Sequence, residues 1–219
     1  MNKMFSFITK SWNPVGGECR INCPYCWAKK LIKTYKMEKY EGPARIYPKE
    51  LLKKFRADDF IFVSDMRDLF ESNVPSGLIQ QVLDYIEKSP AKFLLLDKNP
   101  QRYLEFNLPD NCVPGATIET DLGFGRMERI IAMRKVSSPK MVCIEPIMNF
   151  TDDFPYKIAS LKPEFVAVGY DNYYSGLVEP SLGRTQDLIA VLRDWGIKVY
   201  EKTLREPFVC EKQSSNGVQ

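Results

Sequence analysis

Three cysteines stand close together near the beginning of the chain, in the stretch "ECRINCPYCW" at residues 18–27. Cys19, Cys23 and Cys26 follow the spacing C-x3-C-x2-C, so three thiols share one short loop. Thiolates bind zinc and the irons of iron–sulfur clusters, and paired thiols also carry out redox chemistry. The spacing therefore predicts a metal centre or a redox site in this loop.

Four interpretations of the loop compete. A structural zinc site takes four ligands, typically two Cys or His pairs, whereas this chain has one group of three cysteines and no histidine. A disulfide would leave one cysteine over, and the remaining Cys112, Cys143 and Cys210 are scattered singly. A thioredoxin-like pair in "CPYC" leaves Cys19 unexplained. A [4Fe–4S] cluster would use all three thiolates and leave its fourth iron open to a small chelating molecule.

The cysteine spacing after the first expected strand, with Tyr25 before the last cysteine, resembles the signature of the radical S-adenosylmethionine superfamily. Five further stretches resemble a phage and bacterial family of unknown function that is related to spore photoproduct lyase: WNPVGG, VSDMRDLF, LLLDKNPQR, ATIET and GIKVYEK. The resemblance implies a [4Fe–4S] cluster on Cys19, Cys23 and Cys26, with S-adenosylmethionine bound to the open iron. It also implies an external electron donor, flavodoxin-like or ferredoxin-like.

The activity that this resemblance implies is reductive cleavage of S-adenosylmethionine to a 5′-deoxyadenosyl radical, which abstracts hydrogen from a substrate that the sequence does not identify. The single cysteine group argues against a second, auxiliary cluster. The alternative from another class of protein is a non-catalytic zinc or iron–sulfur module that binds nucleic acid. Release of 5′-deoxyadenosine on reduction separates the two.

The elements that must position this loop alternate between strand-like and helix-like stretches. We expect strands at 4–9, 60–65, 92–97, 115–120, 141–146, 165–170 and 197–202, and helices at 25–40, 74–89, 99–106, 125–135, 153–161 and 183–196. Repeated βα units predict a parallel sheet, either doubly wound or barrel-like. Because a full eight-fold barrel usually needs ~250 residues, we expect an open parallel (β/α)6-type partial TIM barrel over residues 1–206, followed by a polar, flexible tail over 207–219.

Polar residues follow the expected strands at their carboxyl ends, where such folds place their sites. Ser64 and Asp65 occupy the place of the superfamily turn that contacts the methionyl amine, although Asp65 could equally cap the following turn. Lys98 suits the cofactor carboxylate, with a solvated turn lysine as the alternative. Thr117 and Glu119 share one strand face by two-residue alternation, where ribose hydroxyls or an amine would satisfy the glutamate. Tyr25 completes this cofactor set.

Three more residues are expected near the substrate. Glu145 and Lys202 follow two later strands and either contact the substrate or form an ion pair with each other. Cys143 shares the strand face of Glu145 and could return a hydrogen atom to a substrate radical, which is the role of a cysteine in spore photoproduct lyase. The alternative is that Cys143 only packs, since free cysteine is among the most buried residue types. Cys112 and Cys210 are expected to be incidental.

Charge is distributed unevenly along the chain. Residues 1–56 carry a net charge of +9, whereas the whole chain carries +3. Lys29, Lys33 and Lys36 repeat at helical spacing opposite an apolar stripe of Trp27, Leu31 and Tyr35. This ridge either guides a nucleic acid or is an ordinary solvated face. No apolar run approaches the ~20 residues that span a bilayer, and no signal peptide is evident, so we expect a cytoplasmic protein that keeps its thiols reduced.

Overall fold

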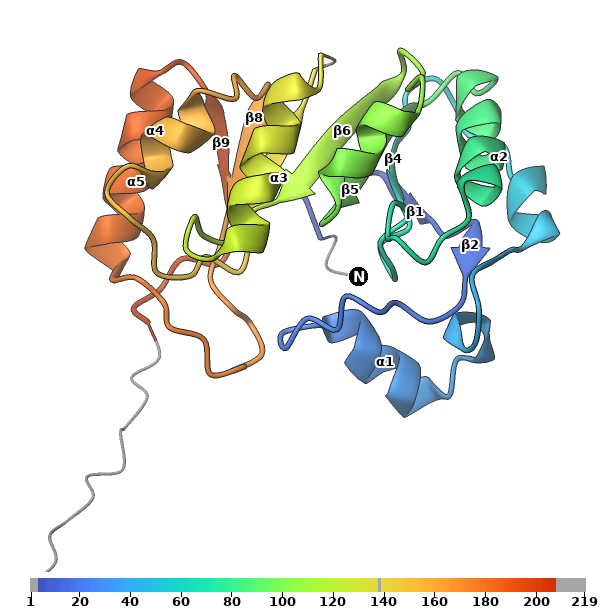
Figure 1. Ribbon diagram of the computed structural model, residues 1–219, viewed down its shortest axis with the longest axis horizontal. Coiled ribbons are helices and arrows are strands. Elements are labelled where there is room, and N and C mark those ends of the chain that lie inside the picture. The colour runs from blue at the N-terminus through green and yellow to red at the C-terminus, as the bar shows by residue number, and fades with distance from the viewer. Residues whose placement is uncertain (1–3, 138, 208–219) are drawn as a thin grey trace, which may run out of the picture.

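The computed structural model describes residues 4–137 and 139–207 (Figure 1). Its centre is a sheet of seven parallel strands, whose order across the sheet follows their order along the chain. The strands are β1 (Lys10–Trp12), β4 (Phe60–Val63), β5 (Lys92–Asp97), β6 (Cys112–Thr117), β7 (Met141–Ile144), β8 (Phe165–Val168) and β9 (Lys198–Glu201). A doubly wound sheet reverses its strand order at a switch point. The sequential order instead confirms the predicted open partial barrel, with β1 and β9 at its two edges.

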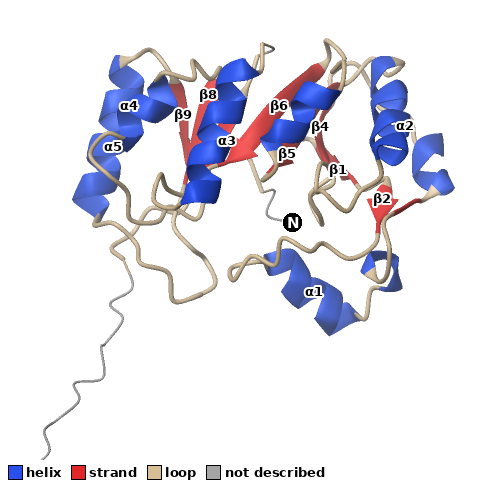
Figure 2. Ribbon diagram, in the orientation of Figure 1, coloured by secondary structure: helices blue, strands red, loops and turns tan. Residues whose placement is uncertain are grey.

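Four of the five α-helices stand in a row in front of the strands, and α1 lies apart from them at the lower edge (Figure 2). The helices are α1 (Trp27–Tyr35), α2 (Ser76–Glu87), α3 (Phe124–Lys135), α4 (Phe154–Ala159) and α5 (Leu182–Asp194). Short 3₁₀ turns are η1 (Glu38–Tyr40), η2 (Pro48–Leu52) and η3 (Pro100–Glu105), and a small antiparallel pair joins β2 (Val15–Gly16) to β3 (Arg45–Ile46).

Strand β5 shows how the sequence builds the sheet. Its stretch "KFLLLD" is almost continuously apolar because both faces of the strand are covered. Phe93 and Leu95 belong to the outer core between the sheet and the helices. Leu94 belongs to a separate inner core on the concave face, together with Phe62 and Cys143. The concave face is therefore apolar in its middle, and the carboxyl ends of the strands bring polar residues to its edge.

The first expected strand is wrong in its position, because residues 4–9 form bends and turns and β1 begins at Lys10. Phe5 and Ile8 are instead buried in the inner core. Phe7 stacks on Phe5 at 5.2 Å between ring centres and meets Phe165 edge-on at 5.0 Å. This amino-terminal segment fills the concave face that an open barrel leaves uncovered.

Strand β6 is shifted in the opposite direction, towards the N-terminus, since it spans Cys112–Thr117 and leaves Glu119 just beyond its end. Within the described ranges, none of the helices has both the length and the apolar character needed to cross a bilayer. The expected tail from residue 207 onward lies outside the described residues except for Pro207, and Cys210 lies outside them as well.

Candidate functional site

The cysteine loop, residues 17–26, runs from β2 to the beginning of α1. Cys26 is the N-cap of α1, and its Sγ accepts a hydrogen bond from the Lys29 backbone N–H at 3.3 Å. Asn22 adopts the left-handed conformation that asparagine tolerates better than most residues. Its side chain accepts a hydrogen bond from Lys29 Nζ at 2.5 Å. The three cysteines are half-buried in this loop, so they are shielded without being sealed from solvent.

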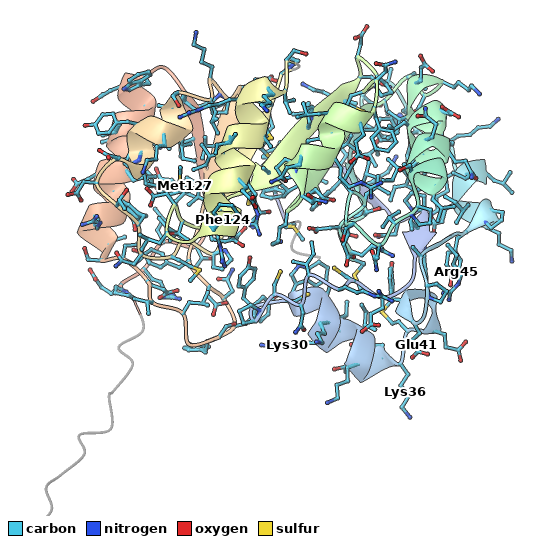
Figure 3. The ribbon with its side chains drawn as sticks, viewed as in Figure 1. Lys30, Lys36, Glu41, Arg45, Phe124 and Met127 are labelled. Carbon is cyan, nitrogen blue, oxygen red and sulfur yellow. The ribbon has the colours of Figure 1, made fainter. Side chains whose placement is uncertain are left out.

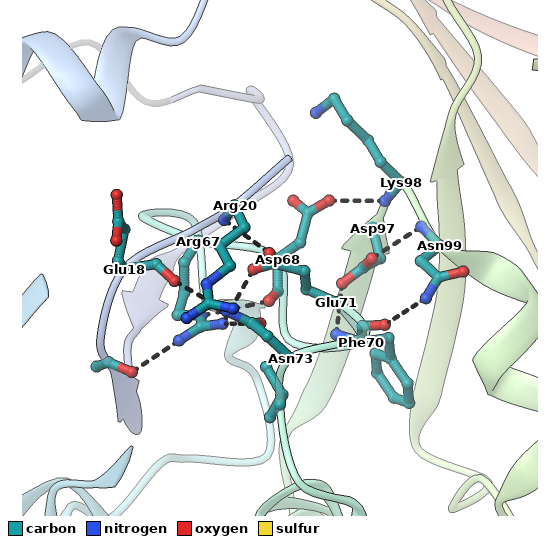
Figure 4. A network of polar contacts seen from close by, with 12 residues as sticks. Glu18, Arg20, Arg67, Asp68, Phe70, Glu71, Asn73, Asp97, Lys98 and Asn99 are labelled. Carbon is teal, nitrogen blue, oxygen red and sulfur yellow. Dashed lines mark hydrogen bonds and ion pairs between the residues drawn. The ribbon is translucent and has the colours of Figure 1, made fainter. Parts of the chain in front are cut away.

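A buried ion pair braces the loop (Figure 4). Arg67 and Glu71 lie 3.1 Å apart, and both side chains are almost fully buried. Glu71 Oε1 accepts a hydrogen bond from the Arg20 backbone N–H at 2.6 Å, and Arg67 Nη1 donates to the Gly16 carbonyl at 2.8 Å. The pair therefore fastens the backbone of the cysteine loop to the segment that follows β4.

Two more carboxylates attach that same segment to the end of β5 (Figure 4). Asp97 accepts hydrogen bonds from the backbone N–H groups of Phe70 at 2.7 Å and Asn99 at 2.9 Å. Asp68 accepts one from the Lys98 backbone N–H at 2.9 Å. Burial, with a smaller contribution from the charge of Asp68, raises the pKa of Asp97 to about 8. These bonds fix the backbone from which the Lys98 side chain extends.

Glu119 is the point where the cysteine loop meets the sheet. The Tyr25 hydroxyl donates a hydrogen bond to Glu119 Oε1, which lies just beyond β6. Glu119 is 1% exposed, and its other oxygen pairs with Arg129 of α3 at 2.7 Å. Arg129 also donates to the Thr117 carbonyl at 2.8 Å. Burial and the charge of Glu119 raise the pKa of Tyr25, so its hydroxyl stays protonated and can donate.

Lys98 lies beside the same loop. Its Nζ is 5.7 Å from the centre of the Tyr25 ring. Burial by itself would lower the pKa of Lys98, but the negative charges of Asp68 and Glu119 raise it above its ordinary value. Lys98 is therefore a firmly protonated cation between the cysteine loop and the end of β5.

Ser64 and Asp65 follow β4 but differ in their surroundings. Ser64 is buried with a left-handed backbone (φ 58°), and its hydroxyl is a buried polar atom without a hydrogen-bond partner. Asp65 accepts a hydrogen bond from the Asn13 side chain at 2.6 Å, and its charge contributes to the raised pKa of Tyr40. Asp65 thus ties the end of β1 to this turn, whereas Ser64 keeps an unused polar atom at the strand end.

The opposite side of the concave face carries the expected substrate residues. Lys202 Nζ and Glu145 Oε2 are 2.5 Å apart, so the predicted ion pair forms. Gly169 makes room for it, since a Cβ there would lie 3.0 Å from Lys202 Cβ and 3.3 Å from Glu145 Oε1. Cys143 is buried in the inner core, and burial raises its pKa to about 12, with a smaller contribution from Glu145. Cys143 of β7 is paired with Thr117 of β6, the strand that leads to Glu119.

The lysine ridge of α1 is exposed as expected, at Lys29, Lys33 and Lys36. The apolar stripe opposite it is only partly correct. Trp27 and Leu31 pack against the small core that contains Ala28 and Tyr40. Tyr35 is 70% exposed, because α1 rotates its buried face towards Ala28 and the last turn extends past the core.

The donor set of the loop is three thiols, in a chain without histidine. Such a set suits an iron–sulfur cluster, in which each cysteine binds a different iron, whereas a structural zinc ion takes four ligands. Among the described residues, no group of three or more His, Cys, Asp or Glu side chains is placed to hold a metal ion. Burial raises the pKa of Cys19 to about 12 and also raises that of Cys23. The free thiols therefore stay protonated, and metal binding would release their protons.

Several contacts of this site were missed from the sequence. Arg67 and Glu71 stand four residues apart, the spacing of a helical ion pair, so that signal was available. A buried glutamate at position 119 would need a cation beside it, so a partner for Glu119 could be expected. No local sequence pattern indicated that Arg129 would be that partner. None indicated that Tyr25 would contact Glu119, which lies 94 positions away in the sequence.

Comparison with known proteins gives a family and nothing further. The model of a family described as "Protein of unknown function (DUF5131)" matches residues 2–171. A search of curated proteins found no significant match. A search of solved structures found none either.

Proposed function

The chain belongs to the DUF5131 family of proteins of unknown function, and from its own site we propose that it is a radical S-adenosylmethionine enzyme. One observation carries this proposal: Tyr25, which lies between two cysteines, bonds to Glu119 beyond β6. That contact brings the three-cysteine loop to the carboxyl ends of the strands, where parallel barrels carry their chemistry. The resemblance of the cysteine spacing to the superfamily supports the same assignment.

Cys19, Cys23 and Cys26 are the residues that would hold a [4Fe–4S] cluster, and S-adenosylmethionine would complete it. When bound, the cluster would deliver one electron to the sulfonium of S-adenosylmethionine, whose cleavage gives a 5′-deoxyadenosyl radical that takes a hydrogen atom from the substrate. The electron comes from an external flavodoxin-like or ferredoxin-like donor. Because the thiols must stay reduced until the metal binds, a cytoplasmic location suits the protein.

The residues around the loop are suited to hold the cofactor. Lys98 is a protonated cation that can bind the methionyl carboxylate. Glu119 accepts from Tyr25 and Arg129, and a carboxylate has about four acceptor sites, so it can still receive a ribose hydroxyl or the amine. Ser64 offers its unused hydroxyl at the end of β4. Thr117 and Asp65 support this arrangement, Asp65 through its bond to Asn13.

The substrate would meet the other side of the concave face. The Glu145–Lys202 pair presents an acceptor and a donor together, which can orient a polar group of the substrate. Cys143 lies between this pair and the cofactor residues and keeps its proton, because burial raises its pKa to about 12. We assign it the return of a hydrogen atom to the substrate radical.

Anaerobic reconstitution with iron and sulfide tests the proposal. The protein should bind about four irons, and on reduction with dithionite it should convert S-adenosylmethionine to 5′-deoxyadenosine. The variant with Cys19, Cys23 and Cys26 all changed to alanine should lose both properties, whereas Cys112→Ala should keep them. Zinc as the bound metal, or iron without release of 5′-deoxyadenosine, would instead indicate the non-catalytic binding module.

A further inference from the structure

Exposed apolar side chains gather at one end of this molecule. Among the described residues, eleven large apolar side chains are well exposed. Four of them lie in the loops after β6 and after β8, and a fifth, Phe124, is the first residue of α3, directly after the β6 loop. We call these five residues the apolar rim: Leu122, Phe124, Tyr173, Tyr174 and Val178. A group of this kind at the end of a sheet that carries the site marks an interaction surface.

The two loops of the rim lie next to each other and next to α1. The loop after β7 bonds to both, since Met148 N–H donates to the Glu119 carbonyl and Asn149 N–H donates to the Val178 carbonyl. Lys30 of α1 places its Nζ 5.0 Å from the centre of the Tyr173 ring. The rim and α1, which begins at the cysteine loop, therefore lie side by side at this end of the sheet, and we call the surface that they form the entrance.

The exposure of the rim is built into the fold. Asp171 is 4% exposed, and its carboxylate accepts hydrogen bonds from the backbone N–H groups of Tyr173 at 2.9 Å and Ser175 at 2.5 Å. This holds the loop in the shape that presents Tyr173 outward. Phe124 is 81% exposed at the first position of α3, between Gly123 and Gly125, which leave open space around it.

Cations are interleaved with these aromatic rings. Figure 3 shows Phe124 at the beginning of α3 and Lys30 and Lys36 on α1. The lysine ridge adds Lys29 and Lys33, all exposed. Arg126 follows Phe124 by two residues, and its Nε is buried without a hydrogen-bond partner, 3.9 Å from Glu119 Oε2. Aromatic faces beside positive charges are what single-stranded nucleic acids bind, by base stacking and by phosphate contacts.

We propose that the entrance binds a single-stranded nucleic acid, whose bases stack on Phe124 and Tyr173 and whose phosphates contact the lysine ridge. A duplex would offer phosphates but no free base faces to the rim, and a base can enter a site of this kind only when it is unstacked. Binding of the strand needs neither reduction nor S-adenosylmethionine. Only the reaction of the bound base rests on the proposed function.

Fluorescence anisotropy with labelled 12-nucleotide single strands, of DNA and of RNA, tests this on the iron-loaded protein. Phe124→Ala and Tyr173→Ala should each weaken binding about 5- to 100-fold, the effect of losing one stacked base. Changing Lys29, Lys33 and Lys36 to glutamate should abolish binding, and the wild-type affinity should fall with salt by about −0.7 in log–log slope per phosphate contacted. Tyr156→Ala and Trp195→Ala are matched controls, since both are exposed aromatic residues outside the rim, and they should bind as the wild type does.

No binding at low salt would overturn the proposal, as would tighter binding of the matching duplex or equal losses in the control variants. Capture of a peptide instead of the oligonucleotides would assign the entrance to a protein. Release of 5′-deoxyadenosine, measured without oligonucleotide, reports on the proposed enzyme function separately. A protein that cleaves S-adenosylmethionine but binds no strand keeps that function and loses this inference.

Discussion

Asp97 is a buried acid whose protonation depends on the fold. Its pKa is raised to about 8, first by burial, against ~3.9 in an unfolded chain. The resulting stabilisation is complete below pH ~4 and is lost as the pH rises towards 8. The wild-type free energy of unfolding should therefore fall between pH 6 and 8, by up to about 1.4 kcal/mol per pH unit. Urea denaturation at pH 6, 7 and 8 measures this decline.

Asp97→Asn supplies the comparison. The variant is expected to be less stable overall, because both carboxyl oxygens of Asp97 accept a backbone N–H, and asparagine replaces one of them with an NH2 group that cannot accept. Its stability should nevertheless be nearly flat over the same interval. The chain contains no histidine, so few other groups titrate there and the difference is easily seen. Equal slopes in both proteins would show that Asp97 is ionised throughout.

Glu119 combines a structural and a binding role, which two variants separate. Glu119→Ala leaves Arg129 as a buried cation without its partner, and it should lower the free energy of unfolding by about 3 to 5 kcal/mol. Glu119→Gln keeps an acceptor for Tyr25 and should cost less stability, while still weakening S-adenosylmethionine binding to the iron-loaded protein. Glu87→Ala, at the exposed end of α2, is the control and should stay within about 0.5 kcal/mol. Full cofactor affinity in Glu119→Gln would remove Glu119 from the proposed cofactor pocket.

Strand alternation could predict that Thr117 and Cys143 lie in strands, on one face of the sheet. Glu119 and Glu145 come just after the ends of these strands, so the two-residue period of the sheet no longer fixes them. The sequence could not predict their partners, because Arg129 and Tyr25 come from other elements. Asp65 illustrates the limit: its position after β4 was correct, but Asn13 binds its carboxylate.

At the scale of elements, the cysteine loop depends on the ion pair that braces it. Glu71→Ala should destabilise the protein by about 3 to 5 kcal/mol, because Arg67 is left buried without a counter-charge. It should also speed the loss of iron to a chelator, since the Arg20 N–H loses its acceptor. Denaturation and chelation kinetics measure the two effects.

A double variant distinguishes bracing from general stability. Arg67→Met with Glu71→Leu replaces the buried pair by apolar side chains, which is often neutral for stability. It should regain most of the lost stability and still release iron quickly. Glu18→Ala is the matched control in the same loop, because its side chain is exposed, and it should behave as the wild type. Slow iron release from the double variant would mean that the loop holds its shape without the brace.

Most elements could be predicted from their periodicity, and the exceptions have physical reasons. The residues of β5 matched because a strand buried on both faces is apolar throughout. The stretch at 4–9 has the same composition, yet it packs as a loop because its phenylalanines fill the concave face. The prediction that Tyr35 belongs to the apolar stripe was wrong for a related reason. The helical spacing was correct, but the neighbouring core ends before the last turn of α1.

At the scale of the whole molecule, the amino-terminal segment replaces the strands that would close a full barrel. Phe5→Ala should remove a buried ring from the inner core and lower the free energy of unfolding by about 3 to 5 kcal/mol. Phe124→Ala removes the same number of atoms from an exposed position and should change it by less than about 0.5 kcal/mol. Urea denaturation of both variants makes the comparison. Similar values would show that the segment does not support the sheet.

The overall architecture was accessible because βα units with right-handed crossovers leave few arrangements. That rule also allows a doubly wound sheet, and the sequential strand order is found only in the structure. How widely the barrel stays open, and which segment fills it, could not be predicted, since both depend on packing between residues far apart in the sequence. The arrangement of the site could not be predicted for the same reason, because the cysteine loop and the end of β6 meet only once the sheet has formed.

Gly169 has a consequence for how this family can change over time. A methyl group at that position would crowd Lys202 and Glu145 at once. A side chain there would push on the Lys202 Cβ, which every residue but glycine carries at position 202, so shortening the lysine would not make room. The backbone around the ion pair would have to shift instead, and Glu145 and Lys202 would then meet at a different distance. Positions 145, 169 and 202 are therefore expected to change together rather than one at a time.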